Sequence, residues 1–426
     1  MTTPFRFVHC ADLHLDAPFP RRSEAVRRRL ADGARQALTG LVDRCLSLRV
    51  HALIVAGDLF DDERLTPADE QLLLTEMTRL TEGGVTVVVS HGHSDPGHAA
   101  GRAASMRWPA ERFHRLSAER AEEIVVRDAD GEVVGRVIGK SLASGQEPDA
   151  RLADYPEPSG PEPAVGVVHG SILEGGKGGA DDAAPRATAR LTELGEKGYR
   201  YWALGRSHRR RRVLERPLAW YAGPLMGHGF AEPGPCGALV VSVPATGAPK
   251  VAFERFAPVA WQTLRLDALT GCEDISAVAV AARDALAKAA PATDTHAAGP
   301  LKTVLRLELD GPCPAAPALR TEAGRDELVR ALTDGDDVLD VDILVDGLSS
   351  VVDLDAHADQ PHLLGLSLDV LDEALADDAL LDRLAPPVLA GCVGGSPAAR
   401  REYMRTLLAG LDRQAAELLL RTETEA

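Results

Sequence analysis

Five aspartate and histidine residues stand directly after short apolar runs, and this series constrains the fold more than any other feature of the sequence. They are Asp12, His14, Asp58, His169 and His208. Apolar, β-branched runs of this length are typical of buried strands. In open α/β sheets the carboxyl ends of the strands are where ligands bind. Because carboxylate oxygens and imidazole nitrogens both ligate divalent cations, the series predicts a metal centre at such an edge.

The composition is that of a globular protein. The chain has 426 residues, of which 45% are hydrophobic, and this length predicts two or three domains. A net charge of -17 argues against a protein that coats nucleic acid through bulk charge, although it leaves room for a local basic patch.

The cysteines and the apolar segments bear on location. Six cysteines are scattered without a C-x-x-C pair, and the first residues show neither a basic nor an apolar leader region. These features predict a reducing, cytoplasmic environment and no metal site made from thiolates. No apolar stretch reaches the roughly 18 residues that a membrane span requires, so we expect a soluble protein.

The pattern of elements changes along the chain and predicts three regions. Through about residue 245, apolar runs alternate with helix-period segments, which is typical of an α/β or α+β layered domain. A smaller α/β region follows, and the chain after about residue 360 has a helical pattern. The predicted domains are residues 1–248, 249–350 and 351–426.

The last predicted helix, Ala398 to Arg421, has an apolar stripe. It includes Tyr403, Leu407, Leu408, Leu411, Ala415, Leu418 and Leu419. Packing within its own domain and binding of a partner explain such a stripe equally well.

The strand-end residues lie within longer motifs. These are residues 9–19 (HCADLHLDAPF), 56–61 (AGDLFD), 107–109 (RWP), 168–169 (VH) and 198–205 (GYRYWALG). With them the sequence resembles the calcineurin-like metallophosphoesterases, and more narrowly the bacterial DNA-repair exonucleases of the SbcD/YhaO type. The resemblance is specific through about residue 245 and looser beyond it.

The resemblance implies an α/β (α+β) fold. We expect a four-layer metallophosphoesterase β-sandwich flanked by helices, a small α/β cap domain that helps to choose DNA, and C-terminal helices. The resemblance also implies Mn²⁺ or another divalent ion, DNA as a partner, an SbcC-like coiled-coil ATPase, and a homodimer.

The resemblance also implies roles for the metal ligands. Asp58 would bridge two ions, and Asp12, His14 and His208 would complete the first site. The second site would take His169, a ligand from the third motif and the first histidine of a G-H-x-H motif. Two such ions, about 3.5–4 Å apart, would activate water and clamp the phosphate.

The third motif departs from the family's G-N-H-D, which supplies a metal-ligating asparagine and a general-acid histidine. Here it is Gly92-His93-Ser94-Asp95. Without a gap, His93 takes the ligand position and Ser94 the acid position, and a serine hydroxyl does not transfer protons near neutral pH. With a one-residue gap, His93 takes the acid position and Gly92 the ligand position. One role is lost either way, unless His91 or His98 replaces it.

The last motif, normally G-H-x-H, departs as well, because it is Gly205-Arg206-Ser207-His208. Arginine has no lone pair to give to a cation, so Arg206 is either a loss or a substitute phosphate clamp. Relatives usually carry G-N-x-x-G-R where this chain has residues 223–228 (GPLMGH), a segment we expect to line the site.

Four arginines, Arg209, Arg210, Arg211 and Arg212, directly follow His208. A solvated surface and contact with a nucleic-acid backbone beside the metal explain such a run equally well. Together the features predict a metal-dependent phosphoesterase resembling a DNA-repair exonuclease, with an intact first metal site and attenuated catalysis. The alternatives are an inactive DNA- or partner-binding scaffold and a phosphoesterase with a non-DNA substrate.

Overall fold

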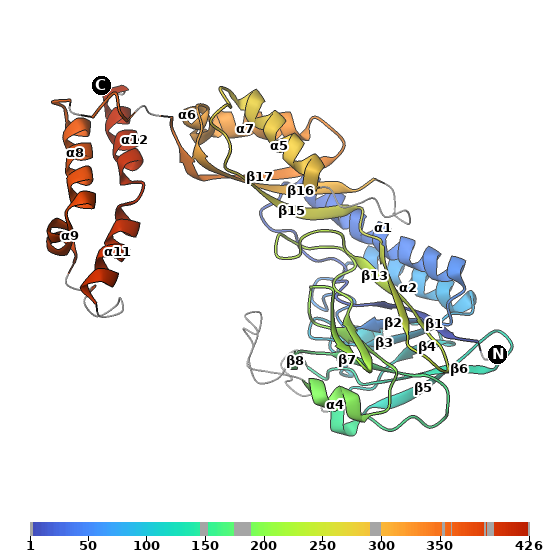
Figure 1. Cartoon of the computed structure of the whole chain (residues 1–426). Coiled ribbons are helices and arrows are strands. Elements are labelled where there is room, and N and C mark those ends of the chain that lie inside the picture. The colour runs from blue at the N-terminus through green and yellow to red at the C-terminus, as the bar shows by residue number, and fades with distance from the viewer. Residues whose placement is uncertain are drawn as a thin grey trace. The chain divides into compact units, whose positions relative to one another are not determined.

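The computed structural model describes residues 3–144, 152–173, 189–289, 300–351, 354–358, 360–386, 389 and 396–424 (Figure 1). Contacts divide the chain into two units. The first comprises Met1–Gln262, Pro291–Leu305 and Asp336–Asp340, and the second comprises Thr263–Ala290, Arg306–Gly335 and Val341–Ala426.

The first unit contains two six-stranded sheets. The first sheet has the order β14-β13-β1-β2-β3-β4. Its strands are β1 (Phe5–Cys10), β2 (Ala52–Ala56), β3 (Thr86–Ser90), β4 (Phe113–Arg115), β13 (Gly237–Val243) and β14 (Lys250–Arg255). Strands β1 to β4 are parallel, so their carboxyl ends meet at one edge.

The second sheet has the order β11-β12-β10-β7-β6-β5. Its strands are β5 (Glu122–Arg127), β6 (Val133–Gly139), β7 (Ala164–His169), β10 (Tyr201–Gly205), β11 (Arg211–Glu215) and β12 (Leu218–Tyr221). The central strands β6, β7, β10 and β12 are parallel. In that register Gly205 is paired with His169, which brings the ends of β7 and β10 together.

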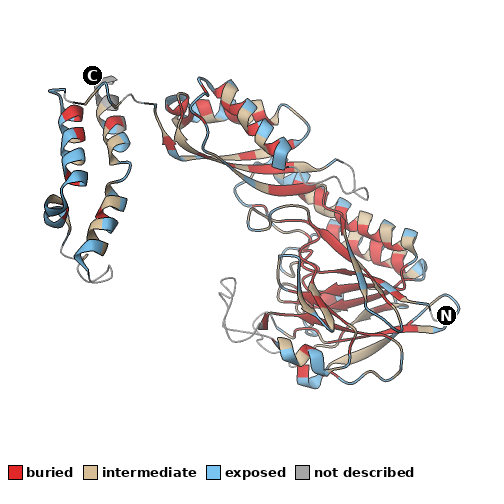
Figure 2. Cartoon of the chain, in the orientation of Figure 1, coloured by how far each residue is buried: buried red, intermediate tan, exposed pale blue. Residues whose placement is uncertain are grey.

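Three apolar clusters show that the first unit has four layers. Phe7 and Ile54 of the first sheet pack against Val165 and Tyr201 of the second. The outer face of the first sheet packs on α1 (Glu24–Leu48) and α2 (Pro67–Glu82). The outer face of the second packs on the 3-10 turn at Leu152–Asp154 and on α4 (Leu191–Glu196). Figure 2 shows the resulting buried sandwich, so the predicted fold is confirmed.

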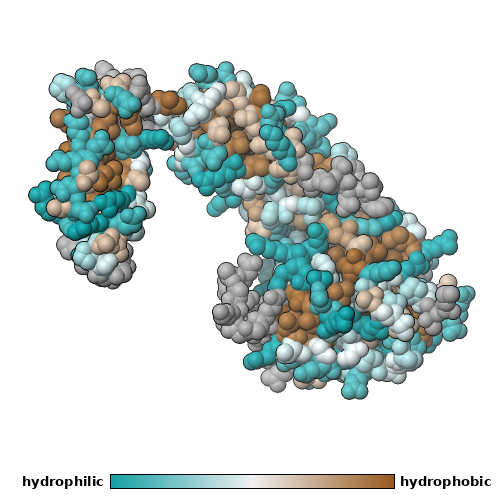
Figure 3. Space-filling view, viewed as in Figure 1, coloured by the Kyte–Doolittle hydropathy of each residue, from teal (hydrophilic) through white to brown (hydrophobic). Residues whose placement is uncertain are grey.

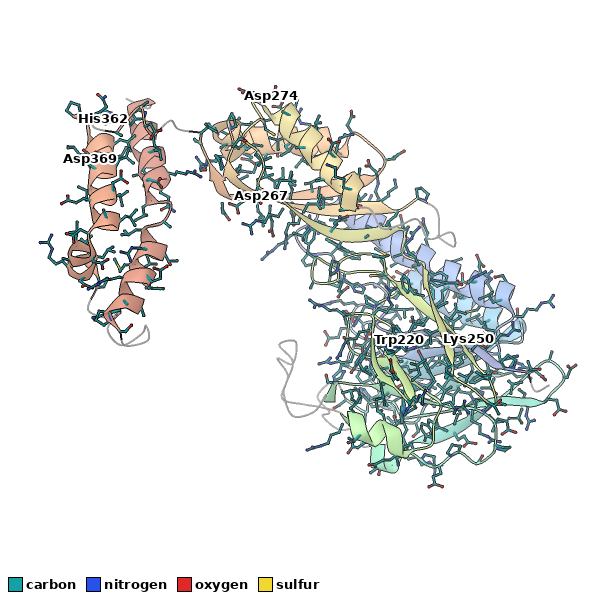
Figure 4. All side chains as sticks on the ribbon, viewed as in Figure 1. Trp220, Lys250, Asp267, Asp274, His362 and Asp369 are labelled. Carbon is teal, nitrogen blue, oxygen red and sulfur yellow. The ribbon has the colours of Figure 1, made fainter. Side chains whose placement is uncertain are left out.

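The side chains of the sandwich alternate as its strands require. On β12, Ala219 and Tyr221 are buried on the outer face, whereas Trp220, labelled in Figure 4, packs against the core between the sheets. The short elements of this unit are α3 (Arg102–Ser105), β8 (Ile172–Leu173) and β9 (Ala189–Arg190).

The later part of the chain contains a three-stranded sheet and a group of helices. The sheet has the order β15-β16-β17, with β15 (Val259–Leu266), β16 (Lys302–Pro312) and β17 (Val338–Ser349), and its helices are α5 (Ile275–Ala289), α6 (Ala316–Arg320) and α7 (Glu322–Thr333). The C-terminal helices are α8 (Leu363–Ala376), α9 (Asp378–Leu384), α11 (Pro397–Leu408) and α12 (Leu411–Thr424). The predicted boundaries at residues 248 and 350 stay predictions.

Two local predictions were wrong. The segment Ala398–Arg421 is two helices, because the chain turns at Gly410, whose φ of 84° favours glycine. The sequence also predicts a helix at Ala187 to Leu194, but the helix begins at Leu191, since Ala189 and Arg190 pair with β8 instead. The sequence further predicts a flexible glycine-rich connection at residues 175–179 and a linker at residues 290–300. The connection and most of the linker lie outside the described residues.

Candidate metal centre

The predicted ligands lie at the carboxyl ends of four strands, in turns with an unusual backbone. Asp12 and His14 follow β1, Asp58 follows β2, His169 ends β7, and His208 follows β10. Asp12, His14 and Asp58 have φ values of 52°, 43° and 51°, and Arg206 has a φ of 103°. Positive φ costs about 1–3 kcal/mol per non-glycine residue and gathers at functional sites. The turns are thus strained where the ligands converge.

Asp12, His14 and His208 form the first group of candidate ligands. One ligand atom from each lies within 4.8 Å of the others. Asp12 is fully buried, and its Oδ1 lies 3.9 Å from His208 Nε2. The rings of His14 and His208 have centroids 5.2 Å apart. One carboxylate and two imidazoles therefore face a common point.

A carboxylate fixes the outer nitrogen of each histidine in this group. His14 Nδ1 is 3.1 Å from Asp61 Oδ1, and His208 Nδ1 is 2.6 Å from Glu232 Oε1. Donation of Nδ1–H to a carboxylate leaves Nε2 as the lone-pair nitrogen, which is the arrangement that metal-binding histidines use.

These carboxylates also set the charge of the group. Burial by itself would lower the pKa of His14, but the hydrogen bond with Asp61 and the nearby Asp58 raise it above the ordinary value. For His208, burial is likewise outweighed by Glu232 and Asp12, and its pKa is raised. Burial would raise the pKa of Glu232, but the hydrogen bonds with His208 and His228 hold it well below the usual range. The carboxylates of this group therefore stabilise positive charge, as on a protonated histidine or a bound cation.

Asp58 lies between this group and the next. Its Oδ2 is 3.5 Å from His14 Nε2 and 3.3 Å from His169 Nε2, and its Oδ1 accepts the backbone N–H of Ser94 at 2.8 Å. Asp12, Asp58 and His169 also have ligand atoms within 4.8 Å of one another. The geometry therefore suits Asp58 to a shared position.

The second group consists of His169 and His93. His169 Nδ1 lies 2.8 Å from the carbonyl oxygen of Ala56, which leaves its Nε2 facing Asp58. The rings of His93 and His169 have centroids 5.2 Å apart. Burial, together with His169 and Arg206, lowers the pKa of His93 to about 4, so it is a neutral imidazole at physiological pH.

Buried nitrogens without partners test whether a cation fits this site. His14 Nε2, His169 Nε2 and His93 Nδ1 are buried and lack a hydrogen-bond partner. An unpaired buried polar atom costs about 1–3 kcal/mol, and divalent cations bound at the two groups would satisfy these lone pairs. The residues present fit a divalent cation.

Comparison with known proteins agrees with this geometry. A family model described as calcineurin-like phosphoesterase matches residues 5–171, and one described as the middle domain of the metallophosphoesterase YhaO matches residues 261–348. The chain is a YhaO-like member of the calcineurin-like metallophosphoesterase superfamily.

One curated relative and two solved structures illustrate the similarity. YhaO of Bacillus subtilis (strain 168), described as an uncharacterized metallophosphoesterase, is 27% identical over 292 residues, which is 68% of this chain and 69% of the relative. A dimetal phosphatase from Danio rerio has a TM-score of 0.34 at 12% identity, covering 58% of this chain and 98% of that one. TT1561 of Thermus thermophilus has a TM-score of 0.34 at 9% identity, covering 59% and 99%.

The third metallophosphoesterase motif is packed tightly against Asp58. A Cβ at Gly92 would lie 2.3 Å from Asp58 Oδ1, so only glycine fits there. With Gly92 held in this place, the next residue, His93, faces His169. The geometry favours the alignment without a gap, in which Ser94 stands at the general-acid position.

Asp95 lies behind the site and positions its loops. Its carboxylate accepts the backbone N–H groups of Asp58, Leu59 and Gly92 at 3.1, 3.0 and 2.8 Å, and lies 3.2 Å from His91 Nδ1. Because these contacts occupy a fully buried carboxylate, the geometry gives Asp95 a positioning role and holds His91 in place.

Arg206 contributes its backbone to one group and its charge to the other. Its N–H donates to both carboxylate oxygens of Asp12, at 3.0 and 3.2 Å. Its side chain is exposed and close enough to His93 to lower the pKa of that imidazole. The following arginines, Arg209 to Arg212, are also exposed.

Sequence reasoning missed Asp61 and Glu232 and gave His228 only a lining role. His228 Nδ1 lies 3.1 Å from Glu232 Oε2, and the His228 ring is 5.4 Å from that of His14. His208, His228 and Glu232 form a further group of candidate ligands. The spacing of four residues between His228 and Glu232 was the available signal.

No helix of the described residues is long and apolar enough to cross a membrane.

Proposed function

We propose that this chain is a divalent-metal-dependent phosphoesterase that hydrolyses DNA phosphodiester bonds with attenuated activity. The observation that carries the proposal is the first ligand group, in which Asp12, His14 and His208 converge and each imidazole is oriented by its own carboxylate. Asp58 completes this group and extends it toward His169.

The chain's own residues prepare the site for a phosphoester. A bound divalent ion supplies a Lewis acid and a water of lowered pKa, and Mn²⁺ is the ion we propose. Asp61 and Glu232 hold the two imidazoles in the metal-binding tautomer. The backbone N–H of Arg206 orients Asp12, and the exposed guanidinium of Arg206 is placed to contact a phosphate oxygen.

The attenuation follows from the third motif. Ser94 stands where the family has its general acid, and its hydroxyl has no pKa suited to protonating a leaving group. His91, the nearest alternative in the sequence, is 1% exposed and hydrogen-bonded to Asp95. We therefore expect a rate about 10²–10⁴-fold below that of an enzyme with a general acid.

DNA is the proposed substrate because of the basic run beside the first ligand group. Arg209 to Arg212 directly follow His208 and are exposed, in a protein whose net charge is -17. Such a local concentration of guanidinium groups against an acidic background suits a phosphate backbone that passes the site.

Purified full-length chain with Mn²⁺ tests the proposal on linear DNA and on bis-p-nitrophenyl phosphate. We expect slow turnover of both, abolished by EDTA. Turnover of the small ester alone would contradict a DNA substrate. No turnover of either, with DNA still bound, would establish the second candidate function, a non-catalytic scaffold, which Ser94 and Arg206 favour.

The partners are a separate part of the proposal. Leu363, Leu366 and Val370 are spaced three and four residues apart on α8 and are 66%, 56% and 58% exposed. Figure 3 shows apolar surface on this helical region, which Asp369 and His362 mark in Figure 4. We propose that α8 binds the coiled coil of an SbcC-like ATPase and that the chain forms a homodimer.

Each partner has its own measurement. Leu366→Lys with Val370→Lys should abolish co-elution with a purified SbcC-like ATPase, whereas Asp369→Lys, at an exposed polar position of the same helix, is the surface control and should keep it. Light scattering of the chain alone should give twice the 45.2 kDa monomer mass. A monomer mass across micromolar concentrations would contradict the homodimer.

A further inference from the structure

A cavity of about 380 Å³ opens beside the first ligand group. His208 and Glu232 form one side of it, so the cavity shares a wall with the candidate metal centre. Ligand pockets usually measure about 300–1,000 Å³, and this one is large enough for a small ligand. A molecule whose phosphate lay at the metal centre would place its next chemical group here.

Arg210 and Phe253 also line the cavity and give it a flat, aromatic and cationic surface. The guanidinium of Arg210 lies 3.5 Å from the centroid of the Phe253 ring. Phe253 is on β14 and Arg210 precedes β11, so the pair joins the edge strands of the two sheets. A guanidinium held over an aromatic ring presents a planar face on which a nucleobase can stack.

The backbone holds this stack in place. Gly223 also lines the cavity and has a φ of 72°, and a Cβ there would lie 2.9 Å from the backbone nitrogen of Arg210. Residue 223 must therefore be glycine for the wall to pack so closely against Arg210. Proline rings, including that of Pro224, supply further apolar wall. Gly223 and Arg210 therefore form a closely packed part of the cavity wall.

We propose that this cavity binds the nucleoside of a substrate or product nucleotide, with the base stacked on Arg210 over Phe253 and the phosphate at the metal centre. The inference rests on the proposed phosphoesterase function and names the part of the substrate that the site recognises. Glu232 at the shared wall offers a hydrogen-bond acceptor to the sugar or to the base edge.

Calorimetry with the Mn²⁺-loaded full-length protein tests the proposal by comparing 2′-deoxyadenosine 5′-monophosphate with inorganic phosphate. We expect the nucleotide to bind more tightly, by the factor of about 5- to 150-fold that one stacked base is worth. Phe253→Leu and Arg210→Gln should each remove most of this advantage, and Phe253→Leu, which changes no charge, should leave phosphate binding unchanged.

The matched control is Phe230→Leu. Phe230 also lies beneath an arginine, since Arg22 is 5.4 Å from its ring centroid, but it does not line this cavity. We expect Phe230→Leu to keep the wild-type preference for the nucleotide. Arg210→Gln changes an exposed side chain, so it keeps the test valid if Phe253→Leu does not fold.

The outcomes separate this inference from the proposed function. Hydrolysis of bis-p-nitrophenyl phosphate together with equal affinity for nucleotide and phosphate would overturn the nucleoside pocket alone. Phe253-dependent nucleotide binding without hydrolysis of any ester would support the pocket and contradict the catalytic function. Nucleotide affinity that survives both pocket substitutions would also overturn the pocket.

Discussion

The two halves of the metal centre use the same kinds of residue but are supported differently. In the first half, His14 and His208 each have a carboxylate, Asp61 or Glu232, at the outer ring nitrogen. In the second half, His169 Nδ1 is hydrogen-bonded to the carbonyl oxygen of Ala56 instead of a carboxylate, and His93 Nδ1 is buried without a hydrogen-bond partner.

The electrostatics differ in the same direction. Carboxylates raise the pKa of His14 and His208, despite their burial. In the second half, burial is outweighed by Asp58 and Asp12, which raise the pKa of His169 to about 9, whereas burial and the charges of His169 and Arg206 lower the pKa of His93. Negative charge surrounds both histidines of the first half, whereas in the second half a cation bound at His93 must approach a guanidinium. A set of metal ligands therefore depends on the residues that hydrogen-bond to the ligands as much as on the ligands themselves.

The largest expected effect is loss of the first half. Asp12→Asn keeps the shape of the side chain but removes the charge that faces His208. We expect Mn²⁺ binding and hydrolysis to be abolished, because the Lewis acid contributes several kcal/mol to the reaction. Metal content by mass spectrometry measures the loss, and His93→Ala is the control in the other half. Equal metal loss in both variants would contradict the inferred difference between the two halves of the centre.

The next largest effect is restoration of the second half. Arg206→His combined with His93→Asn and Ser94→His should raise the metal stoichiometry toward two per chain and the rate by about 10²–10⁴-fold, since it returns a general acid. The His93 ring already lies beside that of His169, and the backbone N–H groups of Ser94 and Arg206 donate to Asp58 and Asp12. A triple variant that binds no more metal than the parent protein would show that the motif positions are misassigned.

A smaller effect is expected from the supporting carboxylates. Glu232→Gln keeps a hydrogen-bonding group but removes the charge at His208 Nδ1, which should weaken Mn²⁺ binding about 10–100-fold. Titration calorimetry measures the affinity. Glu254→Gln, a carboxylate paired with Arg44 away from the site, is the matched control and should leave the affinity unchanged.

The smallest effect concerns the basic run. Arg209→Gln should weaken DNA binding several-fold, uniformly across sequences, and reduce the salt slope of the affinity by about 1. Fluorescence anisotropy over a range of salt concentrations gives that slope. An unchanged slope would assign this arginine to the solvated surface and confine the DNA contact to Arg206 and the rest of the site.

The four-layer fold was expected from the family resemblance, whereas the layered α/β class and the convergence of the strand-end residues follow from local patterns. Buried strands show continuous apolar runs, and parallel strands bring their ends to one edge. Asp61 and Glu232 could not be recognised in this way, since their role depends on loops that return to the site. Glu232 reaches His208 from 24 residues away, across an irregular segment.

The positioning role of Asp95 and the cavity beside Arg210 were also beyond sequence reasoning. Asp95 stands in a motif whose neighbours carry the chemistry, and only its three backbone contacts show that it organises the loops. The Phe253 contact joins strands at the edges of two sheets, and no local periodicity reports such a pairing.

The backbone contact of Arg206 has an evolutionary consequence. Asp12 is oriented by the main-chain N–H at position 206, which every residue except proline provides. The side chain at this position is therefore free to mutate without disturbing the first half of the centre. Some arginine codons become histidine codons by a single base change, so this one position of the second half can be exchanged without rebuilding the first half.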